Sequence, residues 1–283
     1  MFRILVSNHT AAVEADGDRR GRLFPTASPG VTLAGAFVVL SFCLVFMRPW
    51  WNRYLGLTNE DWFQLFGLRI LQGLVPYRDF YLHVPPGQAL TMAALISVFG
   101  NRIVVGEMFG LIAALTLFLA LYVWLARIFP AFWSVVAVIS AAALYLNSST
   151  ESLGGVHLAS ILYPVLAFLA ATFALDQDGG GLLSLSLAGF LAGVSLVTKQ
   201  TAGVATTLSL GVVLPAIIAA RGRWWHGVRA ATVFAIGWVI PVASICAWLA
   251  AHGALRNFLS DAFLHGASSK GSLASSVVST MTA

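Results

Sequence analysis

Residues 103–125 read IVVGEMFGLIAALTLFLALYVWL, and this stretch decides the class of fold. It is long enough to cross the hydrocarbon core of a bilayer as one helix, and Glu107 is its one charged residue. Similar stretches recur along the 283 residues, which are 59% hydrophobic and 10% charged, with a mean hydropathy of +0.85. A soluble domain has about a quarter of its residues charged. The sequence therefore predicts an all-α, polytopic helical membrane protein.

The apolar stretches predict about seven transmembrane helices. We place them at 31–47, 103–125, 132–146, 156–175, 182–198, 202–220 and 228–250. Several are shorter than the ~20 residues of a perpendicular span, so we expect tilt or local thinning of the bilayer. Residues 1–30 are predicted to form a cytoplasmic tail and 31–250 the transmembrane domain. Residues 251–283 are predicted to form an outer-face segment that continues in a longer protein.

Arginine positions set the expected orientation. Short segments on the side of the tail hold the tail arginines, Arg127 and the cluster within 221–229, and the positive-inside rule makes that side cytoplasmic. The connector 176–181 on this side is expected to be a flexible acidic loop. Four polar segments then fall on the outer face: loop 48–102, the turn 147–156, the turn Lys199-Gln200 and the segment after residue 250.

Loop 48–102 concentrates charge, aromatic residues and proline. Residues 58–61 (TNED) begin a helical stretch with apolar residues at helical spacing, at Phe63, Phe66 and Ile70. We expect this helix to lie in the membrane interface with its apolar side toward lipid. The carboxylates of Glu60 and Asp61 either complement the helix dipole or belong to a reactive site.

The second half of the same loop is richer in candidate ligands. Gly73 is expected to end the helix, and YRDFY (77–81) follows. Arg78 beside Asp79 forms either a solvated ion pair or a bidentate clamp for a phosphate. His83, just before the PPG at 85–87, is a metal ligand, a proton carrier or an ordinary surface histidine.

Three further polar residues are expected at the same face. Glu151 follows the third predicted span, and it either converges with the carboxylates of Glu60 and Asp61 or is ordinary loop polarity. Lys199 stands in a tight turn between two apolar spans, where an ionisable group often faces a protein cavity. Glu107 is a candidate partner of Arg102, or lines the same cavity. His157 has no evident partner in the sequence.

The order of these motifs resembles the first outer loop of the GT-C membrane glycosyltransferases. The carrying residues are the acidic group at 59–61, Gly73 fourteen residues after Asn59, PYRDF at 76–80 and PPG at 85–87; GVSLVTKQT at 193–201 resembles a second family segment. The protein-mannosyltransferase-like and lipid A aminoarabinose transferase-like families are the most similar. Asn59 replaces the common Asp, and Val84 replaces a common Lys.

The resemblance implies a function and roles for these residues. It implies transfer of a sugar from a polyprenyl-phosphate donor to a lipid, glycan or protein hydroxyl, at the outer face of a bacterial inner membrane. Glu60 or Asp61 would be the general base and Glu151 a second acid. The expected substrate-binding residues are Arg78, Asp79, His83, Lys199 and Gln200. A divalent metal ion is an implied cofactor, with Glu60, Asp61 and His83 as candidate ligands.

Two other classes of function stay open at this point. A transporter or lipid flippase would use the loop charges to gate a substrate path, although such proteins tend to place ionisable groups mid-membrane on broken helices. A non-catalytic lipid-binding membrane protein would keep the loop without turnover. The positive net charge of +5 suits contact with anionic membrane lipids, and no motif indicates nucleic-acid binding.

Overall fold

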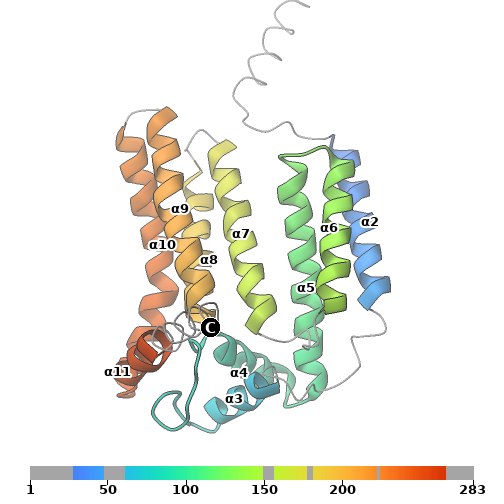
Figure 1. Cartoon of the computed structure of the whole chain (residues 1–283). Coiled ribbons are helices and arrows are strands. Elements are labelled where there is room, and N and C mark those ends of the chain that lie inside the picture. Colours follow the sequence, from blue (N-terminus) through green and yellow to red (C-terminus); the bar gives the residue numbers. More distant parts are fainter. Residues whose placement is uncertain (1–27, 48–60, 149–155, 177–180, 222–223, 266–283) are drawn as a thin grey trace, which may run out of the picture.

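The computed structural model describes residues 28–47, 61–148, 156–176, 181–221 and 224–265, which fold into helices with no strand among them (Figure 1). The helices are α2 (Pro29–Met47), α3 (Asp61–Leu71), α4 (Gly87–Phe99), α5 (Ile103–Ala126), α6 (Ala131–Ser148), α7 (Val156–Asp176), α8 (Leu182–Thr198), α9 (Gln200–Arg221), α10 (Trp224–Ala251), α11 (Leu255–Phe258) and the π-helix η1 (Leu259–His265).

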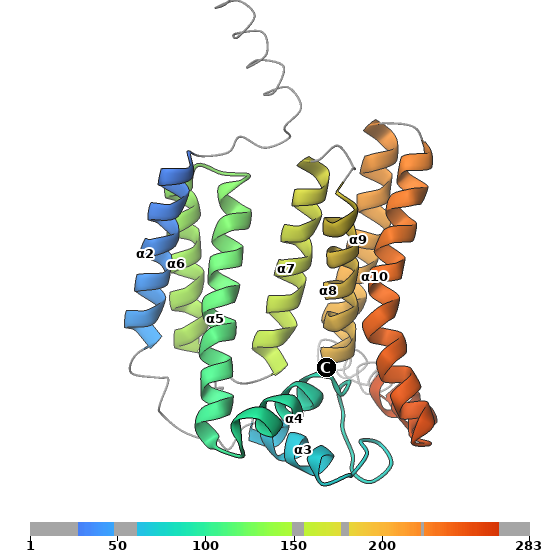
Figure 2. The same ribbon diagram turned by 180° about the vertical axis from the view of Figure 1, so that it is seen from behind.

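Five of these helices, α2, α5, α7, α9 and α10, are long and apolar enough to cross a membrane. The shorter apolar helices α6 and α8 run beside them, as both ribbon views show (Figures 1 and 2). Each of the seven predicted spans falls inside one of these seven helices. The prediction of a polytopic helical membrane protein is therefore confirmed.

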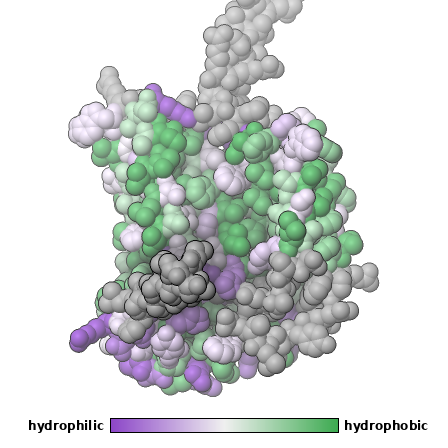
Figure 3. All heavy atoms as spheres, viewed as in Figure 1, coloured by the Kyte–Doolittle hydropathy of each residue, from purple (hydrophilic) through white to green (hydrophobic). Residues whose placement is uncertain are grey.

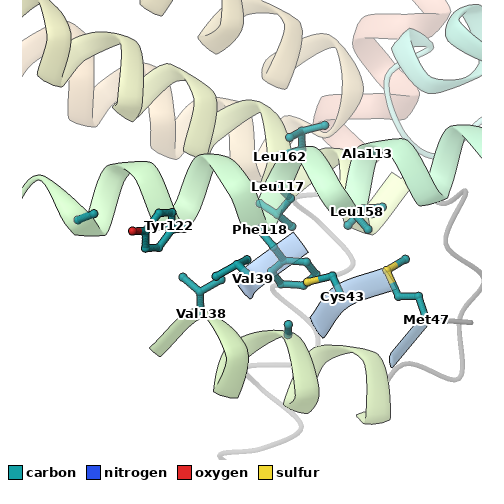
Figure 4. Close-up of a cluster of buried hydrophobic side chains, with 13 residues drawn as sticks. Val39, Cys43, Met47, Ala113, Leu117, Phe118, Tyr122, Val138, Leu158 and Leu162 are labelled. Atoms are coloured by element: carbon teal, nitrogen blue, oxygen red, sulfur yellow. The ribbon is translucent and has the colours of Figure 1, made fainter. Parts of the chain in front are cut away.

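The seven long helices form two groups, each with its own buried core. In the first group, Val39 and Cys43 of α2 lie against Phe118 of α5 and Val138 of α6 (Figure 4). In the second group, α7 to α10 bury mostly small and branched residues, including Ala170. Helix α7 joins the two groups, since its first turns pack into the first core and its later turns into the second.

Glycines let α8 and α10 approach each other closely. A Cβ at Gly189 would overlap the carbonyl of Phe234, one at Gly237 would overlap the carbonyl of Ser186, and one at Gly193 would come 2.7 Å from Cγ of Pro241. Small residues at helix interfaces allow this backbone contact, which supplies packing energy in a lipid environment. The α8–α10 pair is thus fixed by glycine positions on both helices.

The helices α3 and α4 lie across one end of the bundle, which we name the α4 end (Figure 1). Hydrophilic residues gather at this end, whereas hydrophobic residues cover much of the bundle sides (Figure 3). Phe63 and Phe66 of α3 are buried against the protein, with Ile70 packed beside them. The expectation that this side of α3 faces lipid is therefore wrong, because Phe80 and the loop residues around it cover it; Trp62 and Leu65 are exposed instead.

At the opposite end of the bundle, an ion pair joins α5 to α7. Arg127 pairs with Asp176, both side chains are largely buried, and the guanidinium lies 4.1 Å from the ring centroid of Phe173. Asp176 is the last residue of α7 and is not part of a free acidic loop, which corrects the expectation for that residue. Exposed aromatic residues mark the same end, including Trp224 and Trp225, as is typical of a membrane boundary.

We predict that Gly189→Ala destabilises the protein, whereas Gly211→Ala does not. Both new methyl groups would meet Phe234, but the first overlaps its backbone carbonyl and the second reaches its ring at an ordinary 3.4 Å. Overpacking typically costs about 1–3 kcal/mol, and Ala is favoured over Gly in a helix interior by about 1 kcal/mol. Melting temperatures in detergent test this, and equal values for the two variants would contradict the packing described.

Candidate functional site

Four segments distant in sequence meet at the α4 end. The start of α7, the turn between α8 and α9, the loop from Gln72 to Pro86, and the segment from His252 to His265 are joined by the contacts described below. Three of them belong to regions that the sequence predicts to lie on one face, and the start of α7 adjoins the fourth such region, the turn 147–156. The structure thus brings the expected polar regions to one end of the bundle.

Lys199 lies at this end, between α8 and α9. Its backbone is extended (φ −149°, ψ 112°), so it separates α8 from α9, and its N–H donates to the carbonyl of Ser195. The turn is tight, because a Cβ at Gly203 would overlap Leu196. The Nζ of Lys199 lies 2.8 Å from Nδ1 of His157 in the first turn of α7. The two half-buried side chains therefore connect the α8–α9 turn to α7.

His83 adds a third basic side chain to this pair. Desolvation lowers the pKa of its imidazole below the usual 6.5, and electrostatic interaction with His157 and Lys199 lowers it further. His83 therefore lies within electrostatic reach of both. We name Lys199, His157 and His83 the basic cluster.

The double proline positions helix α4 beside this cluster. Pro85 and Pro86 are buried and α4 begins at Gly87, where a Cβ would come 2.5 Å from the carbonyl oxygen of Val197. A glycine is therefore needed for the N-terminus of α4 to contact the last turn of α8. As a result the N-termini of α4, α7 and α9 all lie at the α4 end, and helix N-termini favour negative charge.

Arg78 and Asp79 form an ion pair with each other. Nε and Nη2 of Arg78 donate to the two carboxylate oxygens at 2.9 and 2.8 Å. The N–H of Val75 also donates to Asp79, and these bonds, led by that from Arg78, lower the pKa of the Asp79 carboxyl to about 2. The Arg78 side chain is 45% exposed. The solvated ion pair, left open by the sequence, is the arrangement observed, so Arg78 would have to exchange partners to clamp a phosphate.

The turn at Tyr77 holds this part of the loop against the C-terminal segment. Tyr77 has φ 65°, a left-handed conformation that costs a non-glycine residue about 1–2 kcal/mol. Its hydroxyl donates to the carbonyl of Val84 at 2.5 Å, and its ring lies 5.2 Å from that of Phe258. Asn257 donates to its carbonyl at 2.9 Å. Burial raises the pKa of the Tyr77 phenol, and the charge of Asp261 raises it further.

Gln200 ties the same segment to helix α9. Its Nε2 donates to the carbonyl of Ala262 at 2.9 Å, and its Oε1 is buried without a hydrogen-bond partner among the residues described. The side-chain amide of Gln200, which the sequence predicts to bind substrate, therefore already donates a hydrogen bond within the protein. Gly73, with φ 86°, ends α3 as predicted.

The predicted acids are the part of the site that the structure leaves undescribed. Glu60 and Glu151 lie outside the described residues, and Asp61 is described only as the first residue of α3. Among the described side chains, no group of three His, Cys, Asp or Glu residues could hold a metal ion. The roles assigned to these acids, and the metal site with His83, stay predictions.

The sequence offered no partner for His157, which the structure brings to Lys199. A signal for His157 was present: its predicted span begins at the face where the Lys199 turn lies, so both residues occupy helix ends at one level.

Comparison with known proteins gave no relative for this chain. No family model, no curated protein and no solved structure matches it significantly. The class that the fold defines is a polytopic helical membrane protein with a basic cluster at one end of the bundle.

We predict that His83 makes stability fall at acidic pH. Because its pKa is lowered in the folded protein, the unfolded chain takes up the proton more readily, and folding loses stability as the pH falls below about 6.5. The substitution His83→Gln removes this contribution of His83 to the pH dependence of stability. Melting temperatures at about pH 7.5 and about pH 5.5 should therefore differ less for His83→Gln than for the wild type; an unchanged difference would show that the pKa of His83 is not lowered in the folded protein.

Proposed function

We propose that this protein is a membrane glycosyltransferase that moves a sugar from a polyprenyl-phosphate donor to an acceptor hydroxyl. The observation that carries the proposal is the basic cluster, which gathers Lys199, His157 and His83 from three segments at one end of the spans. Lipid phosphates lie at the membrane surface, and basic side chains there attract anionic headgroups.

In the proposed reaction, Lys199 and the two histidines hold the donor phosphate. A carboxylate, Glu60 or Asp61, takes the proton from the acceptor hydroxyl while its oxygen bonds to the anomeric carbon. The bond from that carbon to the phosphate oxygen breaks, and its electron pair leaves on the phosphate. Lys199 stabilises the charge that develops there, because a positioned cation is most effective where charge appears in the transition state. Glu151 is proposed as a second acid.

The arrangement of charge favours a transferase over a transporter. In the described parts of the long helices, charged residues such as Glu107, His157 and Arg229 lie within about two turns of a helix end. Helices α7, α9 and α10 also continue through Pro164, Pro215 and Pro241 without a break. Transporters tend instead to bind their cargo near the bilayer midplane on interrupted helices.

The proposal includes an orientation and a location. The end opposite the α4 end carries Arg127, Arg221 and Arg229, which the positive-inside rule makes cytoplasmic. The basic cluster would then face outward from a bacterial inner membrane, with the N-terminus in the cytoplasm. A lipid, glycan or protein could supply the acceptor hydroxyl. A divalent metal stays an implied cofactor, and no step is assigned to it.

We predict that Lys199→Gln weakens binding of a long-chain polyprenyl phosphate. Hydrogen bonds to charged groups contribute about 1.5–3 kcal/mol, so the dissociation constant should rise about tenfold or more. His157→Gln should act in the same direction. Arg78→Gln should raise the dissociation constant by a smaller factor, because Asp79 already pairs with the Arg78 guanidinium.

Native mass spectrometry of protein in nanodiscs with added polyprenyl phosphate measures this. Arg221→Gln is the matched control, because it removes one cation at the opposite end of the bundle. Equal weakening in Lys199→Gln and Arg221→Gln would indicate a general effect of charge and contradict a phosphate site.

We predict that the double substitution Glu60→Gln with Asp61→Asn abolishes transfer while the protein still folds. Loss of a general base typically lowers the rate by about 10²–10⁴-fold. Release of polyprenyl phosphate from a polyprenyl-phosphate glycoside measures the reaction, and the melting temperature checks folding. Transfer retained by a folded double variant would exclude these two residues as the base.

A further inference from the structure

The hydrogen bond between Lys199 and His157 limits the charge that these two side chains can carry together. The Nζ of Lys199 lies 2.8 Å from Nδ1 of His157. A lysine ammonium has only donors, and an imidazolium carries a proton on both of its nitrogens, so no hydrogen bond can form when both side chains are protonated. Like charges at such a distance also repel each other. The contact therefore requires that the pair carries one positive charge rather than two.

The elements around the pair contribute charges of both signs. The titratable groups on them are His83 of the motif loop, Asp261 of η1, and Glu107 near the start of α5. His157 itself lies in the first turn of α7, and a helix N-terminus favours a bound anion. An anion that accepts hydrogen bonds from both Lys199 and His157 replaces the bond between them. It thereby removes the constraint on their combined charge.

The proposed reaction changes the charge of the phosphate. A polyprenyl-phosphate glycoside is a phosphodiester with one negative charge. When the bond to the anomeric carbon breaks, the product is a phosphate monoester, whose second pKa is about 6, so it carries nearly two negative charges at neutral pH. The proton of the acceptor hydroxyl passes to the carboxylate base and then to water. The site therefore holds a monoanion before transfer and a dianion after it.

We propose that the Lys199–His157 pair takes up one proton as the second phosphate charge forms, so that its charge matches both the donor and the product. The inference rests on the proposed transferase function and deepens it, because it makes His157 the residue that distinguishes product from donor. In the donor complex, His157 accepts from Lys199. In the product complex, both side chains donate to phosphate oxygens, and the added proton comes from water. Hydrogen bonds between charged partners are the strong ones, so the product is held more tightly than the donor.

Farnesyl phosphate and its methyl ester test this assignment, because they carry the same chain on a dianionic and a monoanionic phosphate. Isothermal titration calorimetry of the protein in nanodiscs, in two buffers that differ in ionisation enthalpy, measures both the affinity and the protons taken up on binding. At about pH 7.5 we expect the wild type to take up about one proton with farnesyl phosphate and much less with the methyl ester. Farnesyl phosphate should also bind about tenfold or more tightly than the ester.

The substitution His157→Asn keeps an acceptor for Lys199 and removes the group that takes the proton. Proton uptake should then be largely lost, and the two ligands should bind with similar affinity. A merely structural role of His157 would weaken both ligands alike and leave their affinity ratio unchanged. His157→Gln is a second variant with the same expected result, and melting temperatures check folding. His226→Gln is the matched control, because it removes an exposed histidine near the start of α10, at the opposite end of the bundle.

The outcomes separate this inference from the proposal on which it rests. Binding of farnesyl phosphate without proton uptake, or uptake that persists in a folded His157→Asn, would overturn the role of the pair and leave the phosphate site intact. A wild type that binds neither ligand would instead overturn the phosphate site of the transferase proposal, and the proton uptake with it.

Discussion

The structure depends on the exclusion of charge from the hydrocarbon core of the membrane. Backbone groups that cannot reach water must be paired within helices, and charged side chains must lie at the helix ends. In a chain with 10% charged residues, this constraint leaves few places for them. The described charged residues of the long helices accordingly lie near helix ends. Whether two polar residues meet in the folded protein therefore depends less on their separation in sequence than on the end of the span that each one occupies.

The same constraint explains how the site is assembled. Lys199 and His157 are far apart in the chain, yet each stands at the α4 end of a span, and their nitrogen atoms lie 2.8 Å apart. The close α8–α9 turn and the contact of Gly87 with Val197 bring α4 to the same point. The segment after α10 is held at the same end by two hydrogen bonds. Asn257 donates to the carbonyl of Tyr77, and Gln200 donates to the carbonyl of Ala262. A scaffold of packed apolar helices thus positions polar groups that come from four segments.

The sequence predicted the spans well, because apolar length is a direct consequence of bilayer thickness. Each predicted range lies within an observed helix, and Gly73 ends α3 as expected. The sequence did not predict the features that depend on tertiary packing. Phe63 and Phe66 could face lipid or protein by periodicity alone, and the buried ring of Phe80 determines the outcome. The partners of His157 and Asp176 were likewise unpredictable, since they come from distant parts of the chain.

The central claim is that the basic cluster receives an anionic lipid headgroup. A cryo-electron microscopy structure of the protein in nanodiscs containing a polyprenyl phosphate tests it most directly. The account predicts phosphate density in contact with Nζ of Lys199 and beside His157, at the end where α3 and α4 lie. Phosphate density only at the opposite end, near Arg221 and Arg229, with none at Lys199, would contradict it.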